Sequence, residues 1–530
     1  MRNPFAQPDR HDSQLALDRR RFLAATGSLA AAAVWSSRAW GVTRRHLALA
    51  DNPFQIGVAS GDPSPTGFVL WTRLAPKPLE GGGMPAEDVE VDWQVAEDEQ
   101  FSKVVRKGTT VAKPDWAHTV HVEVDGLEPD RWYWYQFRAA GETSPKARSR
   151  TTPPLESTPE RLRFAFASCQ HWESGLYTAY EHMLKDDVDL VFHLGDYIYE
   201  GAGSTVAKLR KHVGPKLFEL VDYRNRHAQY KTDPALQAMH AAAPWIVAWD
   251  DHEFENNCAG LNPEHPERTT PEKYKAQRAN SYQAYYEHMP LRIASLPQGH
   301  EMLLYRRIPY GQLAEFNVLD TRQYRTDQPN GDGLKFPGDA VLDPQGTILG
   351  EAQRNWLFEG LGKSQSKWNV LAQQVMMARV DFKPGDEIGH SMDQWPGYEQ
   401  DRRRVLKYLY DRKIHNPVVL TGDIHSNWAN ELIADFDDLG SQSVATEFVG
   451  TSISSGGDGM KESPRAATAL AENPFVKFAN SERGYVRCNV SPKEWKSDYQ
   501  VVEYVTRPGA PAITRAAFVV EDGKPVLNKV

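Results

Sequence analysis

The sequence predicts two folded parts, an all-β sandwich followed by a larger α/β domain. The chain has 530 residues, which exceeds one ordinary domain of roughly 100–200 residues. Residues 51–154 hold short runs in which apolar and polar residues alternate, and this period of two is typical of half-buried strands. Beyond Glu160, short apolar runs alternate with longer helical stretches such as 271–289. Strands that alternate with helices indicate an α/β sheet.

Composition excludes several other classes of protein. Hydrophobic residues make up 40% of the chain and charged residues 25%, unlike a disordered, collagen-like or coiled-coil chain. The net charge of −9 argues against a nucleic-acid binder that works through a broad basic face. The cysteines, Cys169, Cys258 and Cys488, are too few and too far apart for a disulfide scaffold.

The first fifty residues predict an export signal that is removed from the mature chain. Three arginines at 19–21 precede an Ala-rich apolar run over 22–35, which is shorter than the about 20 residues that span a bilayer. Ala-Leu-Ala at 48–50 fits a cleavage site. The pattern Arg-Arg-x-Phe-Leu resembles a twin-arginine signal, with Asp18 where Ser or Thr is usual. We expect export by the twin-arginine machinery to the periplasm or the medium, and no transmembrane segment in the mature chain; the alternative is a basic amphipathic helix.

Residues 51–154 are expected to form the sandwich. Four runs are predicted as strands, namely Gly67–Arg73, Val89–Val95, Thr119–Val124 and Trp132–Phe137. Gly126–Pro129, before the last of these, resembles the corner of fibronectin-type sandwiches, in which a tyrosine closes the turn. Thr151–Pro154 is expected to be an extended linker. The second domain would therefore cover residues 155–530.

Six apolar runs in residues 155–530 each end in residues that bind metals or phosphate. In open α/β sheets, ligands bind beyond the carboxyl ends of the strands. The runs and the residues that follow them are 164–167 with Ser-Cys-Gln-His, 190–194 with Gly-Asp-Tyr-Ile-Tyr-Glu, 245–249 with Asp-Asp-His-Glu, 316–319 with Asp-Thr-Arg, 368–372 with Gln-Gln and 418–420 with Thr-Gly-Asp-Ile-His. Six such endings predict that one crevice gathers them.

The side chains at these ends indicate a metal centre. They offer carboxylates, histidines, a tyrosine, a thiol and an arginine. Carboxylate oxygens and imidazole nitrogens suit hard or borderline divalent and trivalent metals. Two metals about 3.5–4 Å apart need a bridging carboxylate with ligands on both sides. The sequence has no Walker A loop, Rossmann fingerprint or Gly-x-Ser-x-Gly nucleophile motif.

The wording of these motifs resembles a known family. Gly-Asp-x-x-Tyr at 195–199 resembles the calcineurin-like metallophosphoesterases, in particular their purple acid phosphatase branch. Longer stretches across nearly the whole chain resemble the PhoD-type alkaline phosphatases, namely 166–170, 193–200, 223–227, 249–257, 319–325 and 421–427. The resemblance implies a four-layer α/β/β/α catalytic domain behind the N-terminal sandwich. It also implies a centre of ferric iron (Fe3+) with calcium (Ca2+), with zinc or manganese as the alternative metals.

The resemblance implies a role for each matching residue. Asp196 matches the bridging carboxylate and Tyr199 the tyrosinate on iron. Cys169 stands at the first ligand position, where PhoD-type enzymes use a thiolate; the alternative is an inert buried cysteine. His252 matches the histidine that contacts the phosphoryl oxygen or protonates the leaving group.

Asp251, Asp423 and His425 complete the implied metal ligands. Asp251 takes the place of the usual Asn, and an anion there favours an oxygen-loving cation such as calcium. Asp423 replaces the first histidine of Gly-His-x-His and is expected on calcium, whereas His425 is expected on iron. Gln374 or Gln373 either supplies a further oxygen or is structural.

Four residues have more open assignments. Arg322 is predicted to clamp the phosphate oxygens, because a guanidinium matches phosphate in a bidentate manner; the alternative is an ordinary ion pair. Asp250 and Asn257 are candidates for calcium binding or for the surroundings of the metals. His171 stands where the superfamily carries the histidine of Asp-x-His, and its role is left open.

We therefore expect an exported, metal-dependent phosphoric ester hydrolase that scavenges phosphorus. It would hydrolyse small phosphomonoesters and phosphodiesters by in-line attack of a metal-activated water. One alternative is a phospholipase D-like or nucleic-acid-degrading phosphodiesterase on the same scaffold, with a polymeric substrate. Another alternative is a non-catalytic surface binding protein with a decayed metal site. The polar residue at every main ligand position argues against this alternative.

Overall fold

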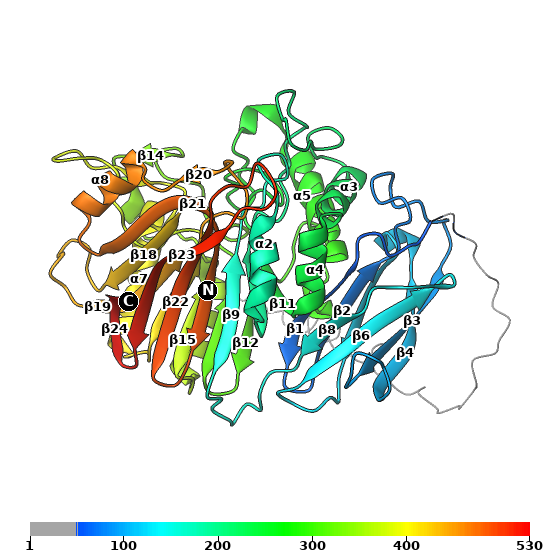
Figure 1. The fold of residues 1–530 in the computed structure, drawn as a ribbon. Helices are drawn as coiled ribbons and strands as arrows, with labels where there is room; N and C mark the ends of the chain where they lie inside the picture. Colours follow the sequence, from blue (N-terminus) through cyan, green and yellow to red (C-terminus); the bar gives the residue numbers. More distant parts are fainter. Residues whose placement is uncertain (1–48, 50) are drawn as a thin grey trace, which may run out of the picture. The chain divides into compact units, whose positions relative to one another are not determined.

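The computed structural model describes residue 49 and residues 51–530 of the chain (Figure 1). The predicted export signal over residues 1–50 therefore lies outside the described residues, apart from Leu49. Among the described helices, none combines the length and the apolar composition needed to cross a membrane.

The N-terminal region consists of two small sheets. The larger has the order β4-β3-β6-β7, with β8 also paired to β6. Its strands are β3 (Val89–Ala96), β4 (Val104–Ala112), β6 (Trp132–Ala139), β7 (Glu142–Thr143) and β8 (Ala147–Arg150). The smaller sheet consists of β1 (Val58–Ser64), β2 (Gly67–Arg73) and β5 (Thr119–Val124). All four predicted strands are present, whereas β1 and β4 were not predicted, because β1 contains Gly, Asp and Pro and β4 is largely polar.

Tyr133 closes the corner before β6, as predicted. Its hydroxyl accepts a hydrogen bond from the backbone N–H of Glu128 at 3.0 Å and lies 3.3 Å from the carbonyl oxygen of the same residue. The Tyr133 ring packs against Phe68 of β2 with ring centroids 6.3 Å apart. The corner is therefore anchored in the interface between the two small sheets.

Strand β1 joins the sandwich to the rest of the chain. Gly61 of β1 pairs in parallel with Trp245 of β11 (Trp245–Ala248). A Cβ atom on Gly61 would lie 2.5 Å from the carbonyl oxygen of Pro290 and 2.6 Å from that of Trp245, so only glycine fits this close approach. The Trp71 indole N–H also donates to the Glu287 carbonyl oxygen at 3.0 Å. The two regions are thus connected by sheet pairing as well as by the linker.

Residues 155–530 contain two larger sheets that share one strand. The first sheet holds parallel β9 (Leu162–Ala167), β10 (Leu190–Leu194) and β11, then antiparallel β21 (Val476–Val490), β22 (Glu494–Val502), β23 (Ala512–Glu521) and β24 (Lys524–Lys529). The second holds β12 (Arg306–Tyr310), parallel β13 (Ala314–Val318), β15 (Trp368–Ala372), β17 (Pro417–Thr421) and β19 (Ser443–Val449), and antiparallel β18 (Asn427–Ile433). Strand β21 pairs with β9 and with β18 and so belongs to both sheets. Each of the six predicted apolar runs lies in one of these strands, with at most one residue beyond the end of the strand.

Helices cover the outer face of each sheet and complete four layers. The first sheet packs against α2 (Thr178–Met183), α3 (Leu220–Lys231), α4 (Pro234–Ala242) and α5 (Pro271–His288). The second packs against α6 (Gly350–Lys363), α7 (Glu399–Asp411) and α8 (Pro464–Glu472). Short strands lie in the connecting loops, namely β14 (Leu334–Lys335), β16 (His390–Ser391) and β20 (Gly459–Met460). This is the predicted α/β/β/α arrangement.

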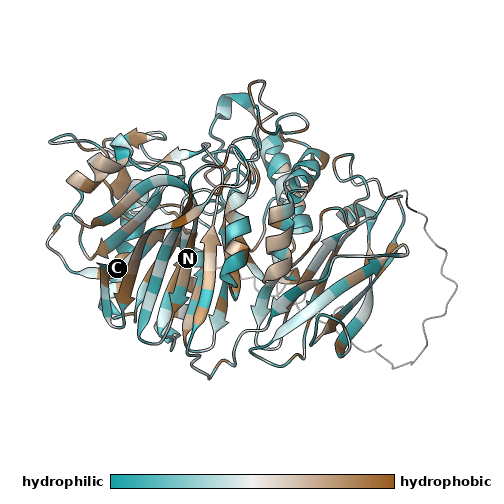
Figure 2. Ribbon diagram, viewed as in Figure 1, coloured by the Kyte–Doolittle hydropathy of each residue, from teal (hydrophilic) through white to brown (hydrophobic). Residues whose placement is uncertain are grey.

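The main core lies between the two sheets. Figure 2 shows bands of hydrophobic and hydrophilic residues along the strands. Phe164 of the first sheet packs edge-on against Phe316 of the second with ring centroids 5.4 Å apart, and Phe192 lies 4.7 Å from Phe316. These rings are fully buried, and each buried aromatic side chain removes roughly 150–250 Å² from water. The sheets are therefore held at a fixed separation next to the site that their strand ends form.

Candidate active site

The site forms where the carboxyl ends of strands from both sheets meet. Cys169 follows β9, Asp196 follows β10 and Asp251 follows β11 in the first sheet. Asp423 and His425 follow β17 in the second sheet. Because parallel strands end at the same edge of a sheet, their loops converge there. The five residues, predicted from four separate strand ends, thus lie at one place in the fold.

Four of these residues have a left-handed backbone. The angle φ is 59° at Cys169, 55° at Asp196, 63° at Asp423 and 52° at His425. This conformation is uncommon outside glycine, and such strained residues cost of order 1–3 kcal/mol each. The strained residues lie just after the ends of β9, β10 and β17, and each of them carries a candidate ligand side chain.

Cys169, Asp196 and His425 form a first cluster of metal-ligand types. One ligand atom of each residue lies within 4.8 Å of the others. The Tyr199 hydroxyl donates to Asp196 Oδ2 at 2.8 Å and lies 3.1 Å from His425 Nε2. The first cluster therefore combines a thiol, a phenol, a carboxylate and an imidazole.

Burial keeps the thiol and the phenol of the first cluster protonated unless a cation is present. Burial, reinforced by the Asp196 carboxylate, raises the pKa of Cys169 and of Tyr199 well above their ordinary values. Burial, reinforced by Arg483, lowers the pKa of His425 to about 3, so its ring is neutral. A bound cation would favour thiolate and phenolate over their protonated forms.

Asp250, Asp251 and Asp423 form a second cluster, also with ligand atoms within 4.8 Å of one another. Asp196, Asp251 and His252 form a third such group, which links the first cluster to the second. Asp250 Oδ2 and Asp251 Oδ1 are buried and have no hydrogen-bond partner. Buried carboxylate oxygens are costly without a donor or a cation. Asp196 belongs to two of these ligand groups, and its role as the bridging carboxylate stays a prediction.

Arg322 lies inside the second cluster. Its Nε donates to Asp250, and its Nη1 lies 2.9 Å from Asp393 Oδ2. Its Nη2 lies 3.2 Å from Asp423 Oδ1 and 3.5 Å from Asp251 Oδ2. The side chain is 1% exposed. The residue predicted to clamp phosphate is therefore enclosed by four carboxylates.

His252 lies beside both clusters and is paired with Glu200. Its Nδ1 is 2.7 Å from Glu200 Oε2, and its ring packs on Tyr199 with centroids 4.2 Å apart. Although burial alone would lower the pKa of His252, Glu200, Asp251 and Asp196 raise it well above its ordinary value. The His252 side chain is 21% exposed. Glu200 is the last residue of the motif Gly-Asp-Tyr-Ile-Tyr-Glu, but the sequence alone did not indicate a role for it.

Gln373 and Gln374 both use their amide oxygen and nitrogen in hydrogen bonds within the fold. Gln374 Oε1 accepts from the Thr321 backbone N–H at 3.0 Å, and its Nε2 donates to the Leu319 carbonyl oxygen at 3.0 Å. Gln373 Oε1 accepts from Trp395 Nε1 at 3.0 Å. The structure thus gives both amides a bracing contact between strand ends, and a metal-ligand role for Gln374 stays a prediction.

Two further residues support the site and were not assigned from the sequence. The Glu253 carboxylate accepts the backbone N–H groups of Asp196 at 3.0 Å and of Asp250 at 2.8 Å, which ties two ligand loops together. Ser455 Oγ donates to the Tyr199 phenol oxygen at 2.7 Å. Glu253 belongs to the Asp-Asp-His-Glu motif, which could have drawn attention to it. Ser455 is brought close only by the fold.

Of the remaining residues considered from the sequence, Asn257 contacts the second cluster, whereas Cys258 and Cys488 do not belong to any ligand cluster. The Asn257 backbone N–H donates to Asp251 Oδ2 at 2.6 Å, so this residue supports the second cluster through its main chain. Cys258 and Cys488 are buried, form no disulfide and each belong to a hydrophobic cluster. They belong to none of the ligand clusters.

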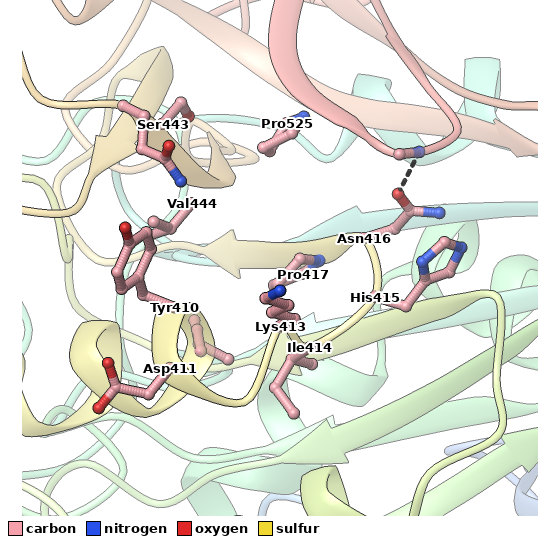
Figure 3. Close-up of a pocket in the computed structure, with 13 residues that line it drawn as sticks. Tyr410, Asp411, Lys413, Ile414, His415, Asn416, Pro417, Ser443, Val444 and Pro525 are labelled. Carbon is pink, nitrogen blue, oxygen red and sulfur yellow. Dashed lines mark hydrogen bonds between the residues drawn. The ribbon is translucent and has the colours of Figure 1, made fainter.

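A separate hollow lies at the opposite end of β17 from Asp423 (Figure 3). It has a volume of about 620 Å³ and is lined by residues 409–411, 413–417, 442–444, Gly523 and Pro525. Asn416 accepts a hydrogen bond from the Gly523 backbone N–H there, at 2.8 Å. None of the predicted site residues lines this hollow.

Comparison with known proteins decides the family. A family model described as PhoD-like phosphatase matches residues 164–499, and the model of its N-terminal domain matches residues 41–153. The chain belongs to the PhoD-like phosphatase family. It is 51% identical over 521 residues to alkaline phosphatase D of Bacillus subtilis (strain 168), covering 97% of this chain and 89% of that protein.

A solved PhoD structure has the same fold. It matches with a TM-score of 0.89 and 52% sequence identity, covering 91% of this chain and 93% of that one. The resemblance drawn from the motifs is confirmed, and so is the fold class. The chain is therefore a PhoD-type phosphatase, a hydrolase.

Proposed function

We propose that this PhoD-type phosphatase hydrolyses phosphomonoesters and phosphodiesters at a mixed centre of ferric iron and calcium. The observation that carries the proposal is the pair of adjoining ligand clusters linked through Asp196 and Asp251. A single cation bound by the first cluster would leave Asp250 Oδ2 and Asp251 Oδ1 without a partner, because Arg322 does not contact these two oxygens. Two or more cations satisfy both clusters.

The donor atoms support a different metal in each cluster. Thiolate, phenolate, imidazole and carboxylate from Cys169, Tyr199, His425 and Asp196 suit iron. The second cluster offers carboxylate oxygens alone, which suit a hard cation such as calcium. The unpartnered oxygens of Asp250 and Asp251 fit that cation. Zinc or manganese would satisfy the first cluster less specifically, because neither requires phenolate.

The residues of the chain then perform separate tasks. Metal ions held by the two clusters would neutralise phosphate oxygens and lower the pKa of a water molecule. The phosphorus–oxygen bond to the leaving alcohol breaks as the bond from the attacking water oxygen forms. The His252 imidazolium, held by Glu200, gives its proton to the leaving oxygen. Glu200 raises the pKa of His252, so the imidazole stays protonated before the proton is transferred.

Arg322 is proposed to hold the second cluster in place. Its guanidinium already faces four carboxylates and has almost no exposed surface. This supports an anchoring role better than the phosphate clamp expected from the sequence. The guanidinium also opposes the rise in pKa that burial causes at Asp250 and Asp423, and it holds the pKa of Asp251 below its ordinary value.

The direct test is elemental analysis of the folded protein together with its visible spectrum. Iron near one atom per chain, calcium, and a tyrosinate-to-iron absorption band are expected. Zinc or manganese without that band would overturn the metal assignment and leave the phosphatase intact. Assays with a monoester, a diester, a phospholipid and single-stranded DNA would then separate a scavenging phosphatase from a phospholipase D-like or nucleic-acid-degrading diesterase.

Export is proposed from the sequence of residues 19–50. The three arginines, the short apolar run and Ala-Leu-Ala before Asp51 support a twin-arginine signal. Mass measurement of the protein recovered outside the cytoplasm should give a chain that begins near Asp51. Replacement of Arg19, Arg20 and Arg21 by lysine should leave the full-length precursor inside the cell.

A further inference from the structure

His171, Glu173 and His212 lie together beside the active site but outside its two clusters. One ligand atom of each lies within 4.8 Å of the others. The His171 and His212 rings meet edge to face with centroids 5.1 Å apart, and His212 Nδ1 is 4.0 Å from Glu173 Oε2. We propose that these three residues form a further binding site for a divalent cation of the zinc class.

His212 carries the observation that points to a ligand. Its Nδ1 is buried and has no hydrogen-bond partner, and its side chain is 1% exposed. Its Nε2 lies 2.9 Å from the Tyr230 hydroxyl. When Nε2 donates to Tyr230, Nδ1 keeps the lone pair that a metal requires. The Gly201 carbonyl oxygen favours the protonated form of this ring and raises its pKa, but burial outweighs that effect.

His171 and Glu173 are held in orientations that fit the same cation. His171 Nδ1 is 2.7 Å from Ser174 Oγ, so donation to Ser174 leaves the lone pair on Nε2. The Glu173 carboxylate accepts the backbone N–H of Ser204 and of His212, each at 2.9 Å. The acid is thereby fixed by the same loop that carries His212. Each ligand is positioned by a neighbour, as is usual around protein-bound metals.

The charge balance favours a cation that prefers nitrogen. Burial, reinforced by Arg226 and His171, lowers the pKa of His212 to about 2, so its ring is neutral and able to coordinate. Arg226 is itself engaged with the carbonyl oxygens of Tyr199 and Gly201. A single carboxylate near an arginine attracts calcium weakly. Two imidazoles and one carboxylate are instead a donor set that zinc uses.

This cation would tie together two loops next to the catalytic centre. Residues 169–174 carry Cys169 at one end and His171 and Glu173 at the other. Residues 201–213 carry His212 and follow Tyr199 and Glu200. The His171 ring contacts the Tyr199 ring edge-on, with centroids 4.6 Å apart. The bound metal would therefore fix the His171 ring, which packs against Tyr199.

The test is a titration of the full-length holoprotein with Zn2+ and, in parallel, with Co2+, in excess Ca2+. After gel filtration, wild type should retain one more equivalent of zinc per chain than His212→Asn or Glu173→Gln. Tyr230→Phe removes only the hydroxyl that orients His212 and should weaken binding by about 10–100-fold. His182→Asn, whose Nε2 contacts the Ala510 carbonyl oxygen elsewhere, is the matched control and should bind as wild type does.

The Asp196→Asn variant shows whether the extra zinc is bound by the main centre or by His171, Glu173 and His212. It removes a ligand of the main centre and leaves His171, Glu173 and His212 unchanged, so the extra zinc should remain. Equal zinc in wild type and in both His212→Asn and Glu173→Gln overturns the proposal. So does the absence of any extra equivalent in wild type. Because Glu173→Gln and Tyr230→Phe keep the shape of the side chain, a folding defect in His212→Asn would not remove the test.

Discussion

Glu200 Oε2 lies 2.7 Å from His252 Nδ1, and the pair sits against the face of Tyr199. The carboxylate fixes both the orientation of the imidazole and its charge. The proton-donating nitrogen that remains, Nε2, belongs to a side chain that is partly exposed beside both ligand clusters. Glu200 is therefore the largest of the acidic influences that raise the pKa of His252, ahead of Asp251 and Asp196.

Glu200→Gln should lower the alkaline limit of activity. The present carboxylate raises the pKa of His252, so its removal lets the proton leave at lower pH. We expect kcat/KM for an alkyl phosphate to fall by about 10²–10⁴, as when general acid catalysis is lost. Phosphate esters with a good leaving group need less protonation and should lose less. Glu97→Gln, in an exposed ion pair with Lys103, is the control; an equal loss for both substrates with an unshifted profile would contradict the role of His252.

Tyr199→Phe should remove the visible absorption band of the iron-loaded protein. The phenol oxygen contacts Asp196 and lies near His425, and phenylalanine keeps the ring packing while deleting that oxygen. Ser455→Ala should shift the band rather than abolish it, because only a hydrogen bond to the phenol oxygen is lost. Tyr305→Phe serves as the control. An unchanged spectrum in Tyr199→Phe would show that the tyrosine is no ligand.

Asp423→Asn and Cys169→Ser should deplete different metals. The first weakens a cluster made of carboxylates, so calcium should fall while iron is retained. The second removes the only sulfur of the first cluster, so iron should fall while calcium is retained. Elemental analysis after gel filtration measures both. Loss of the same metal in the two variants would mean that the clusters do not bind separately.

Arg322→Met should destabilise the metal-free protein strongly. The variant leaves Asp250 buried without its cationic partner and takes the guanidinium away from Asp251 and Asp423, whereas Asp393 keeps Arg325. Breaking a buried ion pair costs about 3–5 kcal/mol. Without the guanidinium, the pKa of these buried carboxyl groups is higher in the folded state than in the unfolded state. The free energy of unfolding of the variant should therefore rise as the pH falls. Denaturant unfolding measures the change. Arg292→Met, in a partly exposed pair with Glu123, should cost less than about 1 kcal/mol.

Gly61→Ala should weaken the joint between the sandwich and the catalytic sheet. The added methyl group would lie 2.5 Å from the Pro290 carbonyl oxygen, and such overpacking costs typically about 1–3 kcal/mol. Gly201→Ala adds the same group where no atom lies within 4 Å and is the control. Thermal unfolding should show a lower midpoint for Gly61→Ala alone. Equal midpoints would mean that the β1–β11 contact does not contribute to stability.

Much of the fold and of the ligand set could be predicted because buried strands reveal themselves locally. The runs ending before Cys169, Asp196, Asp251 and Asp423 are mostly apolar, so each marked both a strand and the polar residue that follows it. Strand β4 could not be predicted, since its exposed face is polar and its pairing with β3 decides its structure.

The partners within the site were harder to predict. Arg322 and Asp393 are 71 residues apart, and Ser455 and Tyr199 are 256 apart. Nothing in a local pattern says that an arginine after a strand will be surrounded by acids rather than face a phosphate. The role of Arg322 therefore depends on packing between both sheets, which only the folded chain reveals.

The left-handed backbone at Cys169, Asp196, Asp423 and His425 places folding and catalysis in opposition. Glycine at any of these positions would relax the main chain and delete a ligand at the same time. A library selected for thermal tolerance alone should accumulate glycine there and return well-folded, inactive proteins. An active lineage must instead gain its tolerance to heat from distant parts, such as the aromatic layer that Phe164 and Phe316 build between the sheets.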